Sequence, residues 1–384
     1  MIKTETKFLQ TVYSILNVPN LRFPGFEGEW DKCKIKDVCS IATGNKNTQD
    51  KDDSGLYPFY VRSPKIEHIN TWTFDGEAIL TAGDGVGVGK VFHYSTGKIG
   101  VHQRVYLLSD FKCNGKYLYY YFSSRFYDRV KRMSAKNSVD SVRMEMIADM
   151  PLTLPTLHEQ IKIGSLLSLL DERISIQNKV IKDLKSLYDV ICQKLYSPND
   201  KLGWQEFKYS DLFTISNERN SRLQYTNVLS ASQEYGMVER GELNIDIKYD
   251  ATSIKNHKIV HPNEYVIHLR SFQGGFAYSD KTGICSPAYT ILVPNGKLIP
   301  AFLKYYFTST QFINSLRIVT YGIRDGRSIS VEEFLQLKIS IPTISEQHYI
   351  LSVMKLWEEK IRIEECHLSN LQKQKQYLLR QMFI

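Results

Sequence analysis

An internal repeat restricts the fold of this sequence more than any other feature. The stretch 147–196 aligns with 334–383, so that Pro155-Thr-Leu-His-Glu159-Gln160 falls on Pro342-Thr-Ile-Ser-Glu346-Gln347. A weaker similarity links the two stretches that precede these copies. The chain therefore alternates between a module and a repeated segment, and each of them is present twice.

The repeated segment carries an apolar heptad pattern. In each copy, apolar residues recur at alternating spacings of four and three over more than four heptads, and proline is absent. This narrow stripe predicts two long helices that pack on each other as a coiled coil. The alternative is two amphipathic helices that each lie on their own globular core. The predicted seam consists of Ile163, Leu167, Leu170, Ile174, Ile181, Leu184, Ile191, Leu195, Ile350, Met354, Trp357, Ile361, Leu368, Leu371, Leu378 and Met382.

Polar residues interrupt this stripe in both copies. Gln177 and Glu364 occupy the same heptad position, where a polar residue can fix helix register at some cost in stability. Lys375 interrupts the second copy once more, so looser packing is expected there.

The two modules are expected to be mixed α/β (α+β) folds with many short strands. Short apolar runs bounded by Gly, Pro, Asn and Asp predict strands. Two aromatic-rich stretches, 117–126 and 301–316, are predicted to be helical. The predicted strands include 78–81, 101–108, 265–269 and 289–293.

The composition excludes several classes of protein. Hydrophobic residues make up 42% of the chain and charged residues 23%, as in ordinary globular proteins. The net charge of +8 permits a polyanionic partner without requiring one. The six cysteines lack metal-ligand spacing, so we expect no zinc site, no redox pair and a cytoplasmic location. No apolar run is long enough for a signal peptide or a membrane span.

Two stretches suggest catalysis, but each lacks a defining residue. The run Gly83-Asp-Gly85-Val-Gly87-Val-Gly89-Lys90 lacks the spacing of a phosphate-binding loop, and Val91 stands where that loop needs a hydroxyl. We interpret it as a glycine-rich connection between strands. Ser286-Pro-Ala-Tyr289 resembles the Ser-Pro-Pro-Tyr type of amino-methyltransferase motif without its second proline, and predicts a turn into a strand. No catalytic or metal-ligating residue is predicted.

Loops in both modules carry the chemistry of a duplex DNA reader. Such a reader needs cations for phosphates, and Arg, Lys, Asn or Gln tips for base edges. The presence of these side chains in both modules argues for nucleic acid more strongly than any single residue does. The predicted DNA-binding residues are Asn45, Lys46, Arg62, Gln103, Arg104, Lys136, Asn137, Arg219, Arg222, Arg270, Gln273, Tyr321, Arg324 and Arg327.

The order of modules and heptad segments resembles the specificity (S) subunit of type I restriction–modification systems. The repeated Pro-x3-Glu-Gln-x2-Ile motif, at 155–163 and 342–350, is similar to that family's motif. The opening Leu-Arg-Phe-Pro-Gly-Phe-x3-Trp at 21–30 is also similar. The similarity extends over essentially the whole chain.

This resemblance implies a division of the chain into four parts. The helices are implied to pack antiparallel, which makes the repeat pseudo-two-fold. The four parts are a first target-recognition domain at 1–156, a central conserved helix at 157–197, a second target-recognition domain at 198–343 and a C-terminal conserved helix at 344–384.

The resemblance also implies a function. The chain would read an asymmetric bipartite site in double-stranded DNA with an unread spacer, and would perform no chemistry itself. Two modification subunits would methylate adenine with S-adenosylmethionine, and restriction subunits would use ATP and Mg²⁺ to translocate and cleave. The alternatives are an S-like subunit of a methyltransferase-only assembly and a coiled-coil scaffold that does not bind DNA.

Overall fold

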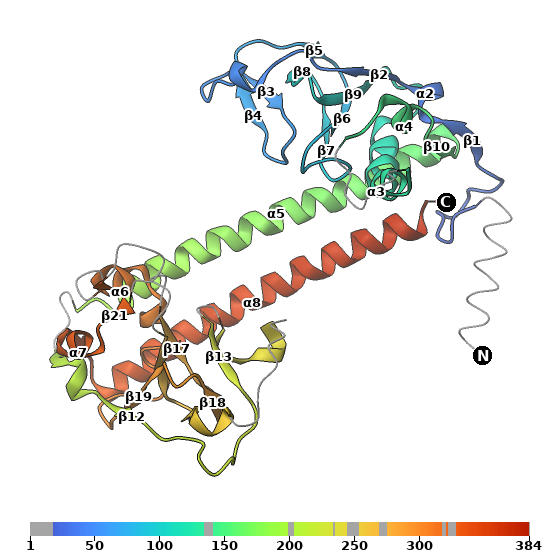
Figure 1. Cartoon of the computed structure of the whole chain (residues 1–384). Coiled ribbons are helices and arrows are strands. Elements are labelled where there is room, and N and C mark those ends of the chain that lie inside the picture. The colour runs from blue at the N-terminus through green and yellow to red at the C-terminus, as the bar shows by residue number, and fades with distance from the viewer. Residues whose placement is uncertain are drawn as a thin grey trace, which may run out of the picture. The chain divides into compact units, whose positions relative to one another are not determined.

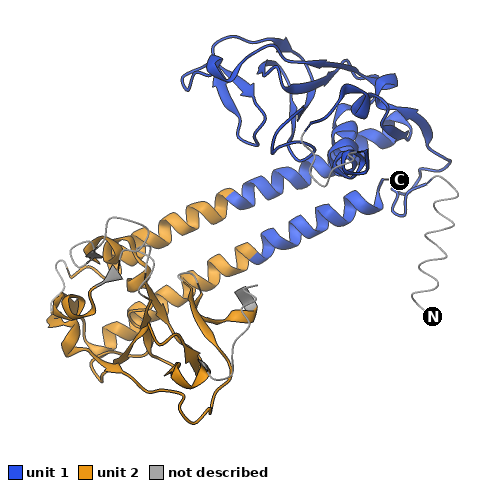
Figure 2. Cartoon of the chain, in the orientation of Figure 1, with its two compact units in different colours: residues 1–178, 366–384 blue, residues 179–365 orange. Residues whose placement is uncertain are grey.

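The computed structural model divides the chain into two compact units (Figure 2). Unit 1 comprises residues 1–178 and 366–384, and unit 2 comprises residues 179–365. This division falls within the long helices, so the predicted domain boundaries stay a prediction. The residues that the structure describes are 18–133, 141–198, 203–232, 235–243, 253–268, 275–316, 320–321 and 328–383.

Unit 1 is built on two four-stranded sheets (Figure 1). The first has the order β2-β9-β6-β7 with antiparallel neighbours throughout, and every residue of β6 is buried. The second has the order β4-β3-β8-β5, in which β3 and β8 run parallel. Their strands are β2 (Ser40–Thr43), β3 (Tyr57–Tyr60), β4 (Glu67–Ile69), β5 (Phe74–Asp75), β6 (Ala78–Ala82), β7 (Phe92–Ser95), β8 (Lys98–Val101) and β9 (Val105–Ser109).

An aromatic helix closes the core of unit 1. This helix, α3 (Gly115–Met133), buries Tyr117, Phe122 and Phe126 on one face because aromatic residues recur there at helical spacing. The rings of Phe122 and Phe126 lie against Phe92 of β7. The remaining elements are β1 (Asp31–Lys34), which pairs with β10 (Pro151–Leu154), and the short helices α2 (Ile35–Val38), η1 (Thr48–Asp50) and α4 (Met144–Ala148).

Unit 2 repeats the first of these sheets. Its four-stranded sheet has the order β12-β19-β16-β17, again antiparallel throughout. The pair β11–β22 corresponds to β1–β10 of unit 1. The strands are β11 (Gln205–Lys208), β12 (Phe213–Ser216), β13 (Leu229–Ser232), β14 (Gly236–Glu239), β15 (Lys258–Val260), β16 (Tyr265–Ile267), β17 (Phe276–Tyr278), β18 (Gly283–Cys285), β19 (Thr290–Pro294), β20 (Thr320–Tyr321), β21 (Ser328–Ile329) and β22 (Lys338–Ile341).

Short helices and stacked rings fill the rest of unit 2. Phe307 lies at the centre of a ring cluster that includes Phe276, Phe312 and Phe334. The helical elements are η2 (Tyr209–Asp211), η3 (Arg240–Leu243), η4 (Ser253–Asn256), η5 (Tyr306–Thr308), α6 (Thr310–Ser315) and α7 (Val331–Gln336).

The structure confirms most predicted elements of the modules and corrects two. The prediction of one strand over 101–108 is wrong, because His102–Arg104 form a turn between β8 and β9. The prediction of one helix over 301–316 is also wrong. Ala301 has a positive φ of 64°, and Ser309 is extended and caps a new helix by accepting a hydrogen bond from the Phe312 amide. The stretch is therefore divided into turns, η5 and α6.

The two long helices are α5 (Leu157–Leu195) and α8 (Ile344–Gln381), and they pack antiparallel. In unit 1 the beginning of α5 lies beside the end of α8, where Lys375 pairs with Asp171 at 2.5 Å. In unit 2 the end of α5 lies beside the beginning of α8, where Lys185 pairs with Glu365 at 2.7 Å. No helix in the described part of the chain is long and apolar enough to cross a membrane.

None of the predicted seam residues is exposed, and they meet two kinds of partner. Toward the outer ends of the helices they join the module cores: Ile163 and Leu378 in unit 1, Ile350 and Leu195 in unit 2. The structure thus combines helix pairing with the packing of each helix end on a globular core. The predicted polar interruption Lys375 pairs with Asp171 and lies 5.5 Å from the centre of the Tyr120 ring.

Candidate nucleic-acid interface

The repeated Glu-Gln pair fastens each module to its helix. In unit 1 the Gln160 side chain accepts a hydrogen bond from the Asn114 amide at 2.9 Å and donates to the Pro155 carbonyl at 2.7 Å. In unit 2 the Gln347 side chain accepts from the Ile299 amide at 2.9 Å and donates to the Pro342 carbonyl at 3.1 Å. Both glutamines are buried. Their hydrogen bonds therefore fix the position of each module relative to the start of its long helix.

The glutamate of the pair has a different partner in each unit. Buried Glu159 forms a two-point ion pair with Arg22, with Nε–Oε1 and Nη2–Oε2 distances of 2.7 and 2.8 Å. Its counterpart Glu346 accepts a hydrogen bond from Trp204 Nε1 at 3.1 Å.

In each unit, a tyrosine–carboxylate hydrogen bond is a second contact between the module and a long helix. Tyr120 donates to Asp171 Oδ2 at 2.8 Å, and Tyr305 donates to Glu358 Oε2 at 2.6 Å. Burial and the neighbouring carboxylate raise the pKa of both tyrosines, so the hydroxyls keep their protons and act as donors.

In unit 1, loops of the module bring several of the predicted DNA-binding residues together. An open pocket of about 480 Å³ is lined by side chains from four separate segments of the first module. Three of the predicted DNA-binding residues, Arg62, Gln103 and Arg104, take part in it. The lining residues are Asn47, Thr48, Gln49, Arg62, Asp84, His102, Gln103 and Arg104.

One carboxylate joins the two arginines of this pocket. Asp84 Oδ1 lies 2.8 Å from Arg62 Nη1, and Asp84 Oδ2 lies 3.1 Å from Arg104 Nη1. The arginine side chains are 47% and 63% exposed, whereas that of Asp84 is 21% exposed. The two arginine side chains are therefore accessible to solvent, whereas the carboxylate that pairs with them is mostly buried.

A buried histidine, His102, lines the pocket. His102 Nδ1 accepts a hydrogen bond from the Arg104 amide at 3.0 Å, and His102 Nε2 lies 3.2 Å from Thr48 Oγ1. Burial, with Arg62 and Arg104 nearby, lowers the pKa of His102. The neutral ring thus accepts at Nδ1 and carries its proton on Nε2, toward the threonine.

The glycine-rich loop contributes Asp84 to the pocket. It joins β6 to β7, as the sequence predicts. The Gly83 amide donates to the Arg104 carbonyl at 2.8 Å, and a Cβ on Gly87 would lie 2.3 Å from the Arg62 carbonyl. Glycine is required at position 87 because the loop packs directly on the backbone beside Arg62. At the tip of this loop, Val86 is 98% exposed.

Asp84 is a functional candidate that the sequence analysis did not identify. Asp84 is separated by about twenty residues from each arginine that it contacts, and no motif links them. One sequence signal could have identified Asp84: it is an acidic residue between two glycines, shortly after the apolar run Ala78-Ile-Leu.

The other predicted residues of the first module lie differently. Lys46 is held through its backbone, because its amide donates to the Val101 carbonyl and its own carbonyl accepts from the Gln103 amide at 2.8 Å. Asn45 is exposed beside it and does not line the pocket. Lys136 and Asn137 lie outside the described residues.

In unit 2 the structure places two of the predicted residues by their side chains. Arg219 stands three residues after β12, as Lys46 does after β2, and its Nη1 lies 3.4 Å from the Asn256 carbonyl. Arg222 is exposed on the following turn, which buried Asn220 holds through the Tyr225 backbone. Tyr321 lies in β20, where only its backbone is described, and Arg270, Gln273, Arg324 and Arg327 lie outside the described residues.

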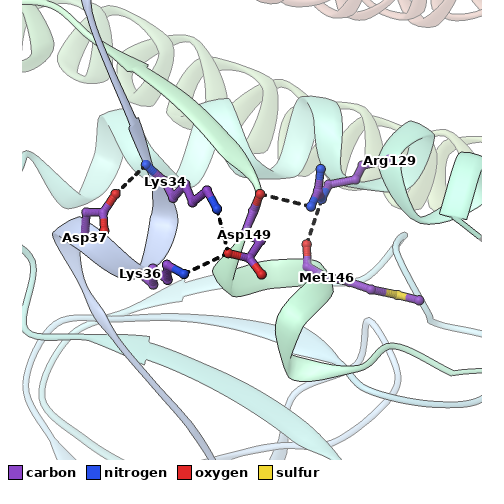
Figure 3. Close-up of polar contacts among 6 residues, drawn as sticks. All are labelled: Lys34, Lys36, Asp37, Arg129, Met146 and Asp149. Carbon is purple, nitrogen blue, oxygen red and sulfur yellow. Dashed lines mark hydrogen bonds and ion pairs between the residues drawn. The ribbon is translucent and has the colours of Figure 1, made fainter.

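A second basic cluster in unit 1 is occupied with internal contacts (Figure 3). Asp149 Oδ1 accepts from Lys34 Nζ at 3.0 Å and from Lys36 Nζ at 2.9 Å. Arg129 donates to the Met146 and Asp149 carbonyls at 2.8 and 3.0 Å, at the end of α4. Hydrogen bonds from the two lysines lower the pKa of Asp149 to about 2. The two lysine side chains are about half exposed, and both are paired with Asp149.

Among the residues that the structure describes, no group of three or more His, Cys, Asp or Glu side chains could hold a metal ion.

The class of this protein is defined by its repeated architecture. The chain contains two copies of a module, each joined to a long helix, and both modules carry basic loops. The family model of the type I restriction modification DNA specificity domain matches residues 27–186 and 201–373. These ranges cover more than half of the chain, which therefore belongs to this family.

One relative agrees with this family assignment. The chain is 23% identical over 203 residues to the type I restriction enzyme EcoDI specificity subunit of Escherichia coli. That alignment covers 52% of this chain and 45% of the relative, so it spans less than half of the relative's length.

Solved structures share the fold. The S subunit of a type I restriction–modification system from M. genitalium matches with a TM-score of 0.61 and 15% identity, over 96% of this chain and 99% of that one. A chain from a type I R-M system, solved in a study of its complex assembly and conformational transition, matches with a TM-score of 0.56 and 13% identity, over 94% and 98%.

Proposed function

We propose that this chain is the DNA-reading subunit of a type I restriction–modification complex. One observation carries the proposal: two modules share one sheet order but present different loops. Within a family of DNA specificity domains, a shared scaffold with unlike loops suits the reading of two unlike half-sites. The target is then asymmetric and bipartite, with a spacer between the halves that no module contacts.

Exposed apolar residues on the two long helices support the binding of two equivalent partner subunits. Leu169 and Ile176 of α5 are exposed in unit 1, and Leu356 and Ile363 of α8 are exposed in unit 2. The repeat places these residues at the same heptad positions in both helices. Exposed apolar residues at a regular helical spacing mark an interaction surface. We assign each surface to one modification subunit, with restriction subunits joining the same complex.

Under this proposal the chain itself performs no chemistry and needs no cofactor. S-adenosylmethionine serves the modification subunits, and ATP with Mg²⁺ serves the restriction subunits. The chain contributes sequence recognition and the spacing between the two readers.

The direct test is to map methylated adenines genome-wide in a host that carries this chain and its cognate modification subunit. We expect one motif of two short unlike sequences at a fixed separation. A contiguous motif, or methylation that is unchanged without this chain, would contradict the proposal. Footprints on two separate patches with steep salt dependence distinguish a DNA reader from a protein scaffold.

An insertion tests the role of the helices as spacers. Four residues, about one helical turn, are added at matched positions of α5 and α8. We expect the motif to keep both halves and to acquire a longer spacer, which the same methylation map measures. An unchanged spacer would show that helix length does not set the separation.

A further inference from the structure

Asp84 stands out among the pocket residues because its charge opposes the expected ligand. A carboxylate repels DNA phosphates, yet Asp84 lies between the two arginines predicted to contact DNA. The glycine-rich loop holds it there firmly, because the Gly83 amide donates to the Arg104 carbonyl and the Val142 amide donates to the Gly83 carbonyl, both at 2.8 Å. This placement needs a reason beyond the connection of two strands.

Stability does not supply that reason. Both arginine side chains are about half exposed, and ion pairs at such positions contribute little to stability. Neither arginine is a buried charge that requires a counter-ion. The contact with Asp84 therefore matters for where the guanidinium groups point rather than for whether the module folds.

The contact leaves the recognition edge of each guanidinium available. Asp84 engages Nη1 of Arg62 and Nη1 of Arg104. In the part of the chain that the structure describes, neither guanidinium has another partner. The adjacent Nε and Nη2 groups present two parallel N–H donors, which match O6 and N7 of a guanine in the major groove.

We propose that Asp84 is a positioning residue that makes Arg62 and Arg104 read base edges instead of phosphates. The carboxylate fixes the direction of both guanidinium groups and offsets part of their charge. The pair then binds weakly to any duplex and forms its base contacts only where the bases match the two forks. This inference rests on the proposed function and assigns to Asp84 the specificity of the first half-site.

The test is the Asp84→Asn variant, assembled with its cognate modification subunits. Binding is measured on a duplex with the mapped target and on an unrelated duplex, over a series of salt concentrations. Without the charge, the two arginines become free to bind phosphates. We expect tighter binding to the unrelated duplex and a salt slope steeper by about 0.9 for each additional phosphate that the arginines neutralise.

Discrimination should fall in the same experiment. A bidentate base contact is worth about 1–3 kcal/mol, or about 5–150-fold in affinity. The ratio of target to unrelated binding should therefore drop at least about 5-fold in Asp84→Asn. Single-base changes in the first half-site should cost the variant less than they cost the wild type, while changes in the second half-site should cost both equally.

Two further variants separate aiming from charge and from folding. Asp53→Asn removes the same charge from an 85% exposed carboxylate of the first module that pairs with Lys51, and it should leave the ratio unchanged. Asp84→Glu keeps the charge but lengthens the side chain, so it should lower the ratio with a wild-type salt slope.

The outcomes distinguish the inference from the function beneath it. An Asp84→Asn complex with wild-type ratio and slope overturns the role of Asp84 and leaves the DNA-reading function in place. Equal losses in Asp53→Asn also overturn it, because net charge would then explain the effect. A wild-type complex that shows no preference for any duplex would instead remove the proposed function.

Discussion

The two modules can be compared strand by strand. The sheet β2-β9-β6-β7 of unit 1 and the sheet β12-β19-β16-β17 of unit 2 have the same order and the same antiparallel pairing. Beside this sheet, unit 1 has a second sheet of four strands, whereas the described residues of unit 2 form the two-stranded sheets β13-β14 and β15-β18. The 19-residue helix α3 of unit 1 is replaced in unit 2 by turns, η5 and α6.

The difference separates what the fold fixes from what it leaves free. The shared sheet buries β6 and β16 almost completely, so core packing constrains these strands in both modules. A connection leaves each of these strands. In unit 1 it is the glycine-rich loop with Asp84, and in unit 2 it spans 268–275, which includes the predicted residues Arg270 and Gln273. The two connections differ in sequence, although the strands that they follow are equivalent.

The repeated glutamate gives the sharpest way to break this comparison. Glu159→Ala leaves Arg22, which is 15% exposed, without its carboxylate, and breaking such a pair costs about 3–5 kcal/mol when burial is complete. Arg22 keeps its hydrogen bonds to the Gly28 and Glu27 carbonyls, so we expect the lower end of this range. Urea denaturation of the full chain measures the loss for unit 1.

The matched change in unit 2 is Glu346→Ala. It removes a hydrogen bond from Trp204 to a charged group, worth about 1.5–3 kcal/mol, and leaves no buried cation, so we expect a loss at the lower end of that range. Equal losses for the two variants would mean that the Arg22 contact adds nothing, and that the glutamates act only through the start of the helix.

The tyrosine–carboxylate contacts sharpen the comparison with a smaller effect. Tyr120→Phe and Tyr305→Phe each remove one hydrogen bond to a charged group, worth about 1.5–3 kcal/mol. In unit 1, Lys375 still neutralises Asp171 after the change, and in unit 2, Lys304 still neutralises Glu358. We therefore expect similar losses near the lower end of that range.

A matched pair of measurements checks this expectation. Hydrogen exchange of the amides in α5 and α8 reports the loss near each tyrosine, and each variant serves as the control for the other unit. A loss that spreads equally over both units would contradict the local role of these contacts.

Helix pairing and the repeat could be predicted because they depend on local periodicity. A stripe with a spacing of 3.5 residues has few structural solutions, and Ile163 and Ile350 mark the same point of each copy. The strand at 78–81 was also predictable, because the apolar run is too short for a typical helix and is followed by turn-forming residues.

The pocket could be predicted only in part, because distant segments build it. Arg62, Gln103 and Arg104 were selected by residue type alone, and β3 and β8 bring them together through a parallel pairing that no sequence pattern announces. Asp84, which contacts the two arginines, is placed by a different pairing, that of β6 with β9. The prediction of one helix over 301–316 was wrong for a related reason. The backbone there follows the packing of the ring cluster around Phe307 rather than the local helix propensity.

The smallest effect concerns a charge that one module has and the other lacks. Asp149 binds Lys34 in unit 1, and at the equivalent place in unit 2, Gln336 Oε1 accepts from Lys208 Nζ at 2.9 Å. The pKa of Asp149 is lowered from 3.8 to about 2, so its ionised form stabilises the folded module. This contribution is complete above about pH 5 and is lost progressively as the pH falls toward 2, when the carboxylate becomes protonated in the folded module as well.

Exchanging the two side chains tests this difference. Asp149→Gln keeps an acceptor for Lys34 but removes the titrating group, so the melting temperature of unit 1 should fall less steeply between pH 4 and pH 2 than in the wild type. The reciprocal Gln336→Asp places a carboxylate beside Lys208 and should make unit 2 more sensitive to acid over the same range. Because Asp149 is an exposed group, both shifts should be small and should shrink further in high salt. Parallel acid profiles for the wild type and both variants would show that a carboxylate stabilises the two lysines no more than an amide does.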